Sequence, residues 1–124
     1  MPTNLPNLSP DICLMIAGGL AIAVAIGHGL TAELYVFRKS VVQPETMRTL
    51  IRLIWQASTV EWIVIGVVLI MTPHLMAGTA RLVVIIAAMV VYGYVAVANF
   101  IATRGRHPGW IAMLIVVGLC YAGR

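Results

Sequence analysis

The residue with the clearest chemical potential is Glu61, because it lies near the middle of the apolar stretch 50–71. A helix of that length rises about 33 Å, enough to cross a hydrocarbon core of about 30 Å. A carboxyl group at that depth costs about 2.5–3.5 kcal/mol, so it normally faces protein or water. Glu61 is therefore either a proton- or cation-coupling site, or a structural carboxyl held by a neighbouring helix. Ser58 lies one turn earlier, close to the same face.

A second polar set comes from three different apolar segments. It consists of His28, Glu33, Arg52, Gln56 and Asn99. Arg52 and Gln56 are four residues apart and share one helix face. Glu33 lies near the membrane surface, where Arg52 or Arg38 would pair with it. The set predicts either a ligand cavity open to the cytoplasm or interhelical hydrogen bonds, which contribute about 0.6 kcal/mol each.

The histidines and cysteines do not form a cofactor site in this reading. His28 falls inside a helix, whereas His74 and His107 fall in loops on opposite sides of the bilayer. Since a metal or haem site needs convergent ligands, no metal ion and no cofactor are expected. Cys13 and Cys120 both fall toward the outer side, where they form either a disulfide or two buried thiols.

Enzymatic activity is not expected from these residues. The chain has no nucleophile–base pair, phosphate loop or nucleotide fingerprint. Gly27 and Gly29 flank His28 inside an apolar helix, where a phosphate-binding loop cannot form. The polar residues therefore indicate binding, packing or transport.

The amino-acid composition indicates whether these residues belong to a soluble or a membrane protein. Of the 124 residues, 61% are hydrophobic and 10% are charged, and the mean hydropathy is +1.00. A soluble domain is about half apolar and a quarter charged, so residues 1–124 are predicted to form a single integral membrane domain. The net charge of +4 resides in short loops rather than in a basic stripe with aromatics. Nucleic acid is therefore excluded as a partner.

The expected elements form an all-α bundle of four transmembrane helices. Their predicted ranges are 11–37, 44–72, 80–103 and 108–122. The predicted boundary residues are Ser9 as the first N-cap, Pro44 at the first position of the second helix, Pro73 as its end, Thr79 as the third N-cap and Gly105 as the third stop. The fourth run, 108–122, covers about 22 Å at about 1.5 Å per residue, so it either spans marginally or is a re-entrant or interfacial segment.

Orientation follows from the basic residues, since Lys and Arg favour the cytoplasmic side. Six of them fall in the first and third connections and their flanks: Arg38, Lys39, Arg48, Arg52, Arg104 and Arg106. Arg81 and Arg124 fall on the other side. The expected topology is antiparallel and up-down, with both termini outside, in a multi-pass protein of the cell inner membrane. Residues 1–10 contain no Lys or Arg and are expected to be an extended lead-in rather than a removable signal peptide.

Part of this pattern resembles a group of small, uncharacterised bacterial four-span inner-membrane proteins. Members carry a His followed five residues later by the acid of a Gly-Glu pair, then a Trp-His pair opening the second helix. The matching positions are His28, Ala32-Glu33 and Trp55-Gln56, with Ala and Gln replacing the Gly and the second His. The resemblance covers about the first half of the chain and implies a tetraspan fold. In architecture alone, the chain is similar to small multidrug-resistance transporters, whose glutamate lies in the first helix.

Two hypotheses follow. The first is a non-enzymatic membrane protein that acts by helix packing, as a homo-oligomer or as an accessory subunit of a membrane complex, with the lipid bilayer and other chains as its partners. The second is a small proton- or cation-coupled transporter or channel that uses Glu61 together with His28, Gln56 and Asn99.

Overall fold

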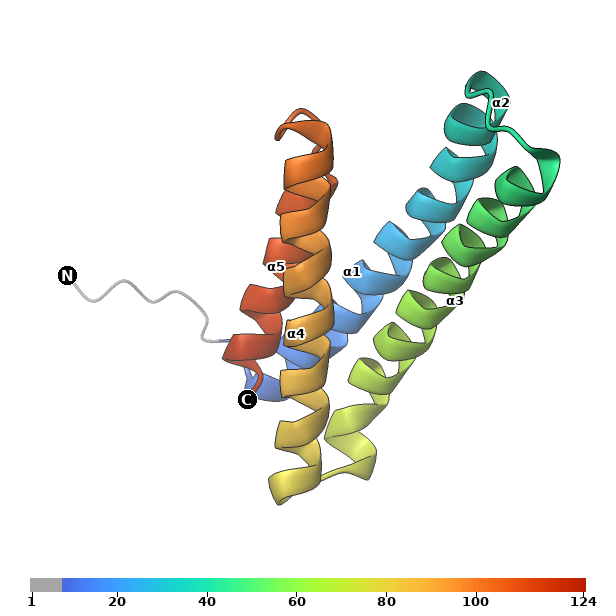
Figure 1. Ribbon diagram of the computed structural model, residues 1–124. Helices are drawn as coiled ribbons and strands as arrows, with labels where there is room; N and C mark the ends of the chain where they lie inside the picture. The colour runs from blue at the N-terminus through green and yellow to red at the C-terminus, as the bar shows by residue number, and fades with distance from the viewer. Residues whose placement is uncertain (1–7) are drawn as a thin grey trace.

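The computed structural model describes residues 8–124, and helices account for all of the regular structure in that range (Figure 1). The lead-in expected for 1–10 lies mostly outside the described residues. The elements are α1 (Pro10–Thr31), η1 (Ala32–Val36), α2 (Phe37–Lys39), α3 (Glu45–Leu75), α4 (Gly78–Thr103) and α5 (Gly109–Ala122). Because α1, η1 and α2 are continuous, residues 8–124 form four helices.

Three of these helices are long and apolar enough to cross a membrane. They are Pro10–Lys39, Glu45–Leu75 and Gly78–Thr103, whereas the apolar α5 is shorter, with 14 residues. At about 1.5 Å per residue, α5 covers only about 21 Å. The all-α class is therefore confirmed, and the long helices are compatible with a small membrane protein.

Two helix ends follow the predicted signals. The Ser9 side chain accepts a hydrogen bond from the backbone N–H of Ile12 at 3.3 Å, so Ser9 is the N-cap of α1. At the end of α4, Arg104 and Gly105 both have positive φ, and the Gly105 N–H donates to the carbonyl of Phe100 at 2.8 Å. The left-handed turn reverses the backbone and satisfies a carbonyl of the last helical turn.

Three other boundaries differ from prediction. The α3 helix continues past Pro73 to Leu75. A proline in the last turn removes only its own backbone hydrogen bond, and the Met76 N–H still donates to the Thr72 carbonyl at 3.0 Å. Thr79 does not cap α4: the helix begins at Gly78, one residue earlier, after Ala77. Pro44 is the residue before α3 rather than its first helical residue.

The first helix contains one wider turn, η1. Here the Phe37 N–H donates to the carbonyl of Ala32, five residues earlier, as in a π-helix. That spacing brings Ala32 and Phe37 onto one buried face, with exposures of 0% and 4%. The turn thereby keeps α2 packed against the start of α3, where the Phe37 ring meets Trp55 edge-on at 5.9 Å.

Glycines allow α1 and α3 to pack closely. A Cβ atom on Gly66 would lie 2.8 Å from the Gly18 carbonyl oxygen, and one on Gly29 would lie 2.9 Å from Thr59. Gly18 and Gly29 therefore lie at the close contact with α3. Gly19 and Gly27 do not, since an added Cβ there would meet no atom within 4 Å.

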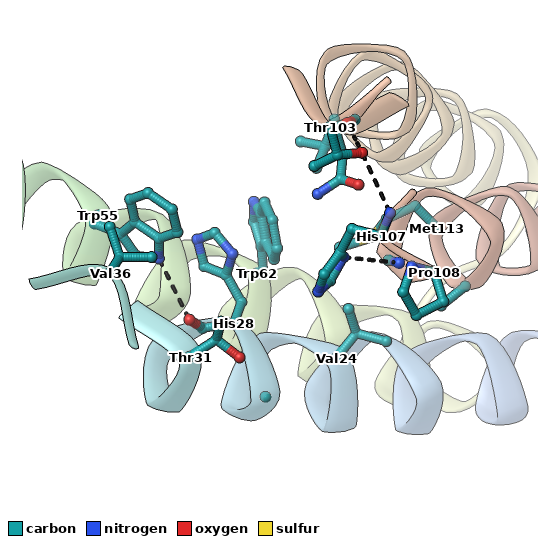
Figure 2. A pocket seen from close by; sticks show the side chains of 15 residues that line it. Val24, His28, Thr31, Val36, Trp55, Trp62, Thr103, His107, Pro108 and Met113 are labelled. Atoms are coloured by element: carbon teal, nitrogen blue, oxygen red, sulfur yellow. Dashed lines mark hydrogen bonds between the residues drawn. The ribbon is translucent and has the colours of Figure 1, made fainter. Parts of the chain in front are cut away.

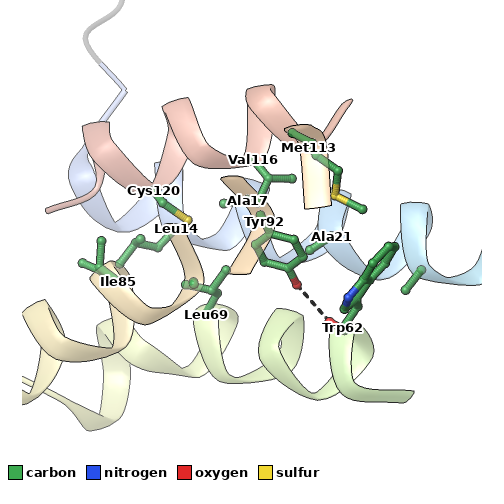
Figure 3. Packing of buried hydrophobic residues seen from close by; sticks show 13 residues of the cluster. Leu14, Ala17, Ala21, Trp62, Leu69, Ile85, Tyr92, Met113, Val116 and Cys120 are labelled. Atoms are coloured by element: carbon green, nitrogen blue, oxygen red, sulfur yellow. Dashed lines mark hydrogen bonds between the residues drawn. The ribbon is translucent and has the colours of Figure 1, made fainter. Parts of the chain in front are cut away.

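The core joins the α1–α3 pair to the α4–α5 pair through α1 and α5 (Figure 3). Leu14, Val116 and Tyr92 are fully buried there. The buried hydroxyl of Tyr92 needs a hydrogen-bond partner, and it donates to the carbonyl of Trp62 at 3.0 Å. This hydrogen bond joins α4 to α3. Elsewhere α3 and α4 make few contacts.

The two helix pairs meet at one end and diverge at the other (Figure 1). At the closed end, Arg81 donates to Asp11 at 2.7 Å and to the Gly123 carbonyl at 2.9 Å, which joins α4 to the beginning of α1 and the end of α5. The diverging end carries the connections 40–44 and 104–108. We call it the basic end, because the six Lys and Arg residues of those connections and their flanks lie there.

Matched alanine substitutions at Gly18 and Gly19 test the packing of α1 on α3. Gly18→Ala places a Cβ against the Gly66 carbonyl, so unfolding should become easier by about 1–3 kcal/mol. Gly19→Ala meets open space and should be neutral or stabilising by up to about 1 kcal/mol, because alanine is the better helix former. Denaturant unfolding in detergent measures both. Equal effects of the two substitutions would contradict the described interface.

Candidate functional site

The divergence of the helix pairs leaves a cleft near the basic end (Figure 2). It comprises a cavity of about 480 Å³ and an adjoining one of about 410 Å³. The two cavities have lining residues in common: His28, Trp55, Trp62, Val95 and Asn99. They are therefore two sides of one space, which we call the interhelical cleft. Its walls are largely apolar.

The His28 ring is inserted between two tryptophans of α3. Trp55 and Trp62 are seven residues apart, which separates them by about 10.5 Å along the helix. The imidazole fills that space, with centroid distances of 4.8 Å to Trp55 and 4.5 Å to Trp62. The Trp55 indole N–H also donates to the His28 carbonyl at 3.3 Å. One turn of α1 is thus held by two turns of α3.

The hydrogen bonds around His28 determine which nitrogen carries its proton. Ser58 donates its only hydroxyl hydrogen to the carbonyl of Trp55 at 2.7 Å. The contact of 3.3 Å between Ser58 Oγ and His28 Nε2 therefore requires that Nε2 be the donor. In the neutral ring, Nδ1 is then an acceptor, and it has no partner within residues 8–124.

The opposite wall of the cleft carries His107 and Asn99. His107 Nδ1 accepts from the Gly109 N–H at 3.0 Å, so the hydrogen of the neutral ring is on Nε2. A Cβ on Gly109 would lie 2.9 Å from His107 Nδ1 and 3.5 Å from Asn99 Nδ2, so the two polar side chains approach each other across this glycine. The loop is held by Trp110, whose indole donates to the Gly105 carbonyl at 3.2 Å.

Asn99 has an unmet hydrogen-bonding requirement. Its Oδ1 atom is buried and has no hydrogen-bond partner within the described part of the chain. Leaving a buried acceptor unpaired costs about 1–3 kcal/mol. Because this atom is closed off from the cleft, a molecule bound there would not reach it.

An ion pair joins η1 to α3, and its residues do not line the cleft. Arg52 binds Glu33 through two hydrogen bonds, of 2.9 and 2.6 Å, and Gln56 donates to the same carboxylate at 2.8 Å. Glu33 thus pairs with Arg52, one of the two partners that the sequence allows, and not with Arg38. The network connects η1 to α3 and neutralises this carboxylate.

Glu61 lies apart from this site. Its side chain is exposed on α3, lines neither cavity, and forms no hydrogen bond or ion pair with residues 8–124. Cys13 and Cys120 also lie away from the cleft. They are free, buried thiols, and the disulfide that the sequence allowed between them is not formed.

Only some of the residues that line the cleft were predictable from the sequence. His28, Ser58 and Asn99 line it, but the placement of His107 in a separate inner loop missed that this loop folds back to face His28. The signal was the turn His107-Pro108-Gly109, whose glycine permits the close approach. Within residues 8–124, no three His, Cys, Asp or Glu side chains are grouped as a metal site requires.

Comparisons with known proteins add no assignment. No protein-family model, curated protein or solved structure matches this chain.

Two histidine substitutions test the insertion of His28. His28→Ala removes the ring between Trp55 and Trp62, so the protein should lose about 2 kcal/mol of stability and its near-ultraviolet circular dichroism should change. His74→Ala alters an exposed residue in the last turn of α3 and should change neither. Unfolding in detergent and the tryptophan spectrum provide the measurements. An unchanged spectrum in His28→Ala would contradict the stacked arrangement.

Proposed function

We propose that this protein is a non-enzymatic membrane protein that binds a lipophilic molecule between its two helix pairs. The observation that carries the proposal is the interhelical cleft, in which one cavity of about 480 Å³ lies within the usual range of ligand sites. Its walls are apolar, and a few polar groups face it from both helix pairs. This combination favours a ligand with a long apolar part and a small polar head.

We place the cleft in the cytoplasmic half of the cell inner membrane. In the proposed topology the helices run up and down with both termini outside, so the basic end faces the cytoplasm. The diverging helix pairs then leave the cleft open to lipid. A ligand would enter it from the bilayer without passing through water.

Glu61 supports a further part of the proposal, that another protein chain covers the exposed face of α3. A carboxyl near the centre of a spanning helix, without a partner among residues 8–124, favours contact with a second chain over contact with lipid. We therefore propose that the protein acts as a homo-oligomer or as an accessory subunit.

Coupled transport is the weaker alternative. It would require Glu61 to share a path with His28 and Asn99, but Glu61 does not line the cleft. The separation supports binding in the cleft and assembly through α3 as two distinct roles.

Leucine substitutions at two exposed glycines test ligand binding. Gly27 lines the cleft and has open space around its Cβ position, so Gly27→Leu fills the cleft without disturbing helix contacts. Gly19→Leu places the same side chain in open space outside it. Mass spectrometry of gently extracted protein should find a lipophilic molecule retained by the wild type and Gly19→Leu, and reduced about tenfold in Gly27→Leu. Equal retention in all three proteins would contradict the proposal.

Glu61→Leu tests the proposed assembly. Native mass spectrometry of the extracted wild type should detect a second chain, either a copy of this one or another protein. Loss of the buried polar contact should reduce the assembled fraction about tenfold, corresponding to about 1.4 kcal/mol. Val90→Leu, on the exposed surface of α4, should leave assembly unchanged. A wild type that is only monomeric would overturn this part of the proposal.

A further inference from the structure

We infer that the ligand of the interhelical cleft is an anionic phospholipid, whose phosphate group binds at the loop 104–108 while an acyl chain lies in the cleft. The inference rests on the proposed function, because it names the class of ligand for the same site. It is carried by hydrogen-bond donors and free positive charges that gather on the α4–α5 side, where this loop borders the cleft.

The loop 104–108 borders the cleft in a fixed conformation. His107 lines the cavity of about 480 Å³ and is exposed. The left-handed turn at Gly105 follows α4, and the Trp110 indole N–H donates to the Gly105 carbonyl at 3.2 Å. In the proposed topology, the loop then lies where the apolar cleft meets the polar surface of the membrane. A lipid with a chain in the cleft therefore places its head group at this loop.

Two side chains of the α4–α5 wall offer hydrogen-bond donors to a phosphate oxygen. His107 Nδ1 is occupied by the Gly109 N–H, so the ring donates through Nε2. Asn99 lines both cavities, and its Nδ2 atom forms no hydrogen bond with residues 8–124. Unlike Oδ1, which is closed off, Nδ2 keeps accessible surface. Both donors favour a ligand that carries acceptor oxygens.

Free positive charge is present on the same side of the cleft. The side chains of Arg104 and Arg106 are exposed and form no hydrogen bond or ion pair with residues 8–124. Guanidinium groups bind phosphate through paired, charge-assisted hydrogen bonds. A phosphate has several acceptor oxygens, so one group can accept from these side chains and from His107 together.

On the α1–α3 side, by contrast, most of the basic residues have partners within the chain. Arg52 is paired with Glu33, and Arg48 donates to the Phe37 carbonyl at 2.7 Å. The Lys39 ammonium lies over an aromatic ring, 5.2 Å from its centre. Charge complementarity therefore places the anionic head group on the α4–α5 side.

The lining of the cleft is consistent with this placement. None of its residues is an Asp or a Glu, which would repel a phosphate or neutralise a cation. His28 Nδ1 is an acceptor on the α1 wall, so the phosphate lies against the opposite wall and only the acyl chain passes His28. A zwitterionic head group would bring a cation to an end of the molecule with surplus Lys and Arg, and it should bind more weakly.

Brominated phospholipids that share their acyl chains and differ in head group test the inference. The protein is reconstituted in phosphatidylcholine vesicles with increasing fractions of phosphatidylglycerol, phosphatidic acid or phosphatidylcholine that carries dibromostearoyl chains. Bromine quenches nearby tryptophans, and Trp55 and Trp62 line the cleft. The quenching that is lost in Gly27→Leu measures lipid in the cleft and corrects for lipid elsewhere. The two anionic lipids should bind about tenfold more tightly than phosphatidylcholine.

Two double substitutions that remove equal charge distinguish a binding site from the general surface potential. Arg104→Gln/Arg106→Gln removes the free guanidinium groups of the loop and should reduce the preference for anionic lipid to about twofold or less. Arg38→Gln/Lys39→Gln removes the same charge from the α2 end, which diverges from that loop (Figure 1), and should preserve the preference. Each variant retains four of the six basic residues of this end, so both should keep the wild-type orientation.

The outcomes separate the inference from the proposed function. If no lipid gives quenching that depends on Gly27, the cleft does not bind lipophiles, and the proposed function fails. If brominated phosphatidylcholine equals the anionic lipids, or if both double substitutions reduce the preference alike, the cleft binds lipid but the phosphate site is overturned. Inorganic phosphate, compared with chloride at equal ionic strength, should not displace the lipids, because it has no chain; displacement would overturn the assignment of a lipid.

Discussion

The interaction on which the site depends is the insertion of His28 between Trp55 and Trp62. The ring occupies a space that the helical repeat of α3 sets, and its Nε2 is committed to Ser58. This contact fixes the register of α1 against α3 near the basic end. The Ser58 hydroxyl also determines which ring nitrogen of His28 carries the proton, so the imidazole presents one defined hydrogen-bonding pattern to the cleft.

The cleft results from a difference in packing between the two ends of the molecule. At the closed end, α1 packs on α5, and Arg81 joins three chain segments. At the basic end, α1 remains with α3, and the loop before α5 is held by Trp110 against α4 instead. The two helix pairs are thus each stabilised internally, which leaves a space between them. In a membrane, such a space is filled by lipid, water, a ligand or another protein.

The helices could be predicted from local sequence signals, whereas helix rotation and loop conformation depend on tertiary contacts. Ser9 bonds to a backbone N–H only three residues away, so its role as an N-cap can be predicted from the local sequence. The apolar runs likewise identify the membrane-spanning lengths without knowledge of their neighbours. Gly18 and Gly27 look alike in the sequence, yet one contacts α3 and the other borders open space, because the helix rotation depends on packing. His107 reaches the cleft because of the conformation of the loop 104–108, and the periodic pattern of apolar residues does not predict loop conformation.

The most direct measurement is nuclear magnetic resonance of methionine methyl groups in nanodiscs with protonated lipids. Met113 is buried and lines the cleft, whereas Met71 is exposed on the outer face of α3. We expect cross-peaks from the Met113 methyl to chain protons of a bound lipophile, and their loss in Gly27→Leu, while those of Met71 to bulk lipid persist. A Met113 methyl that contacts only protein or water would show a closed or hydrated cleft and would contradict lipophile binding there.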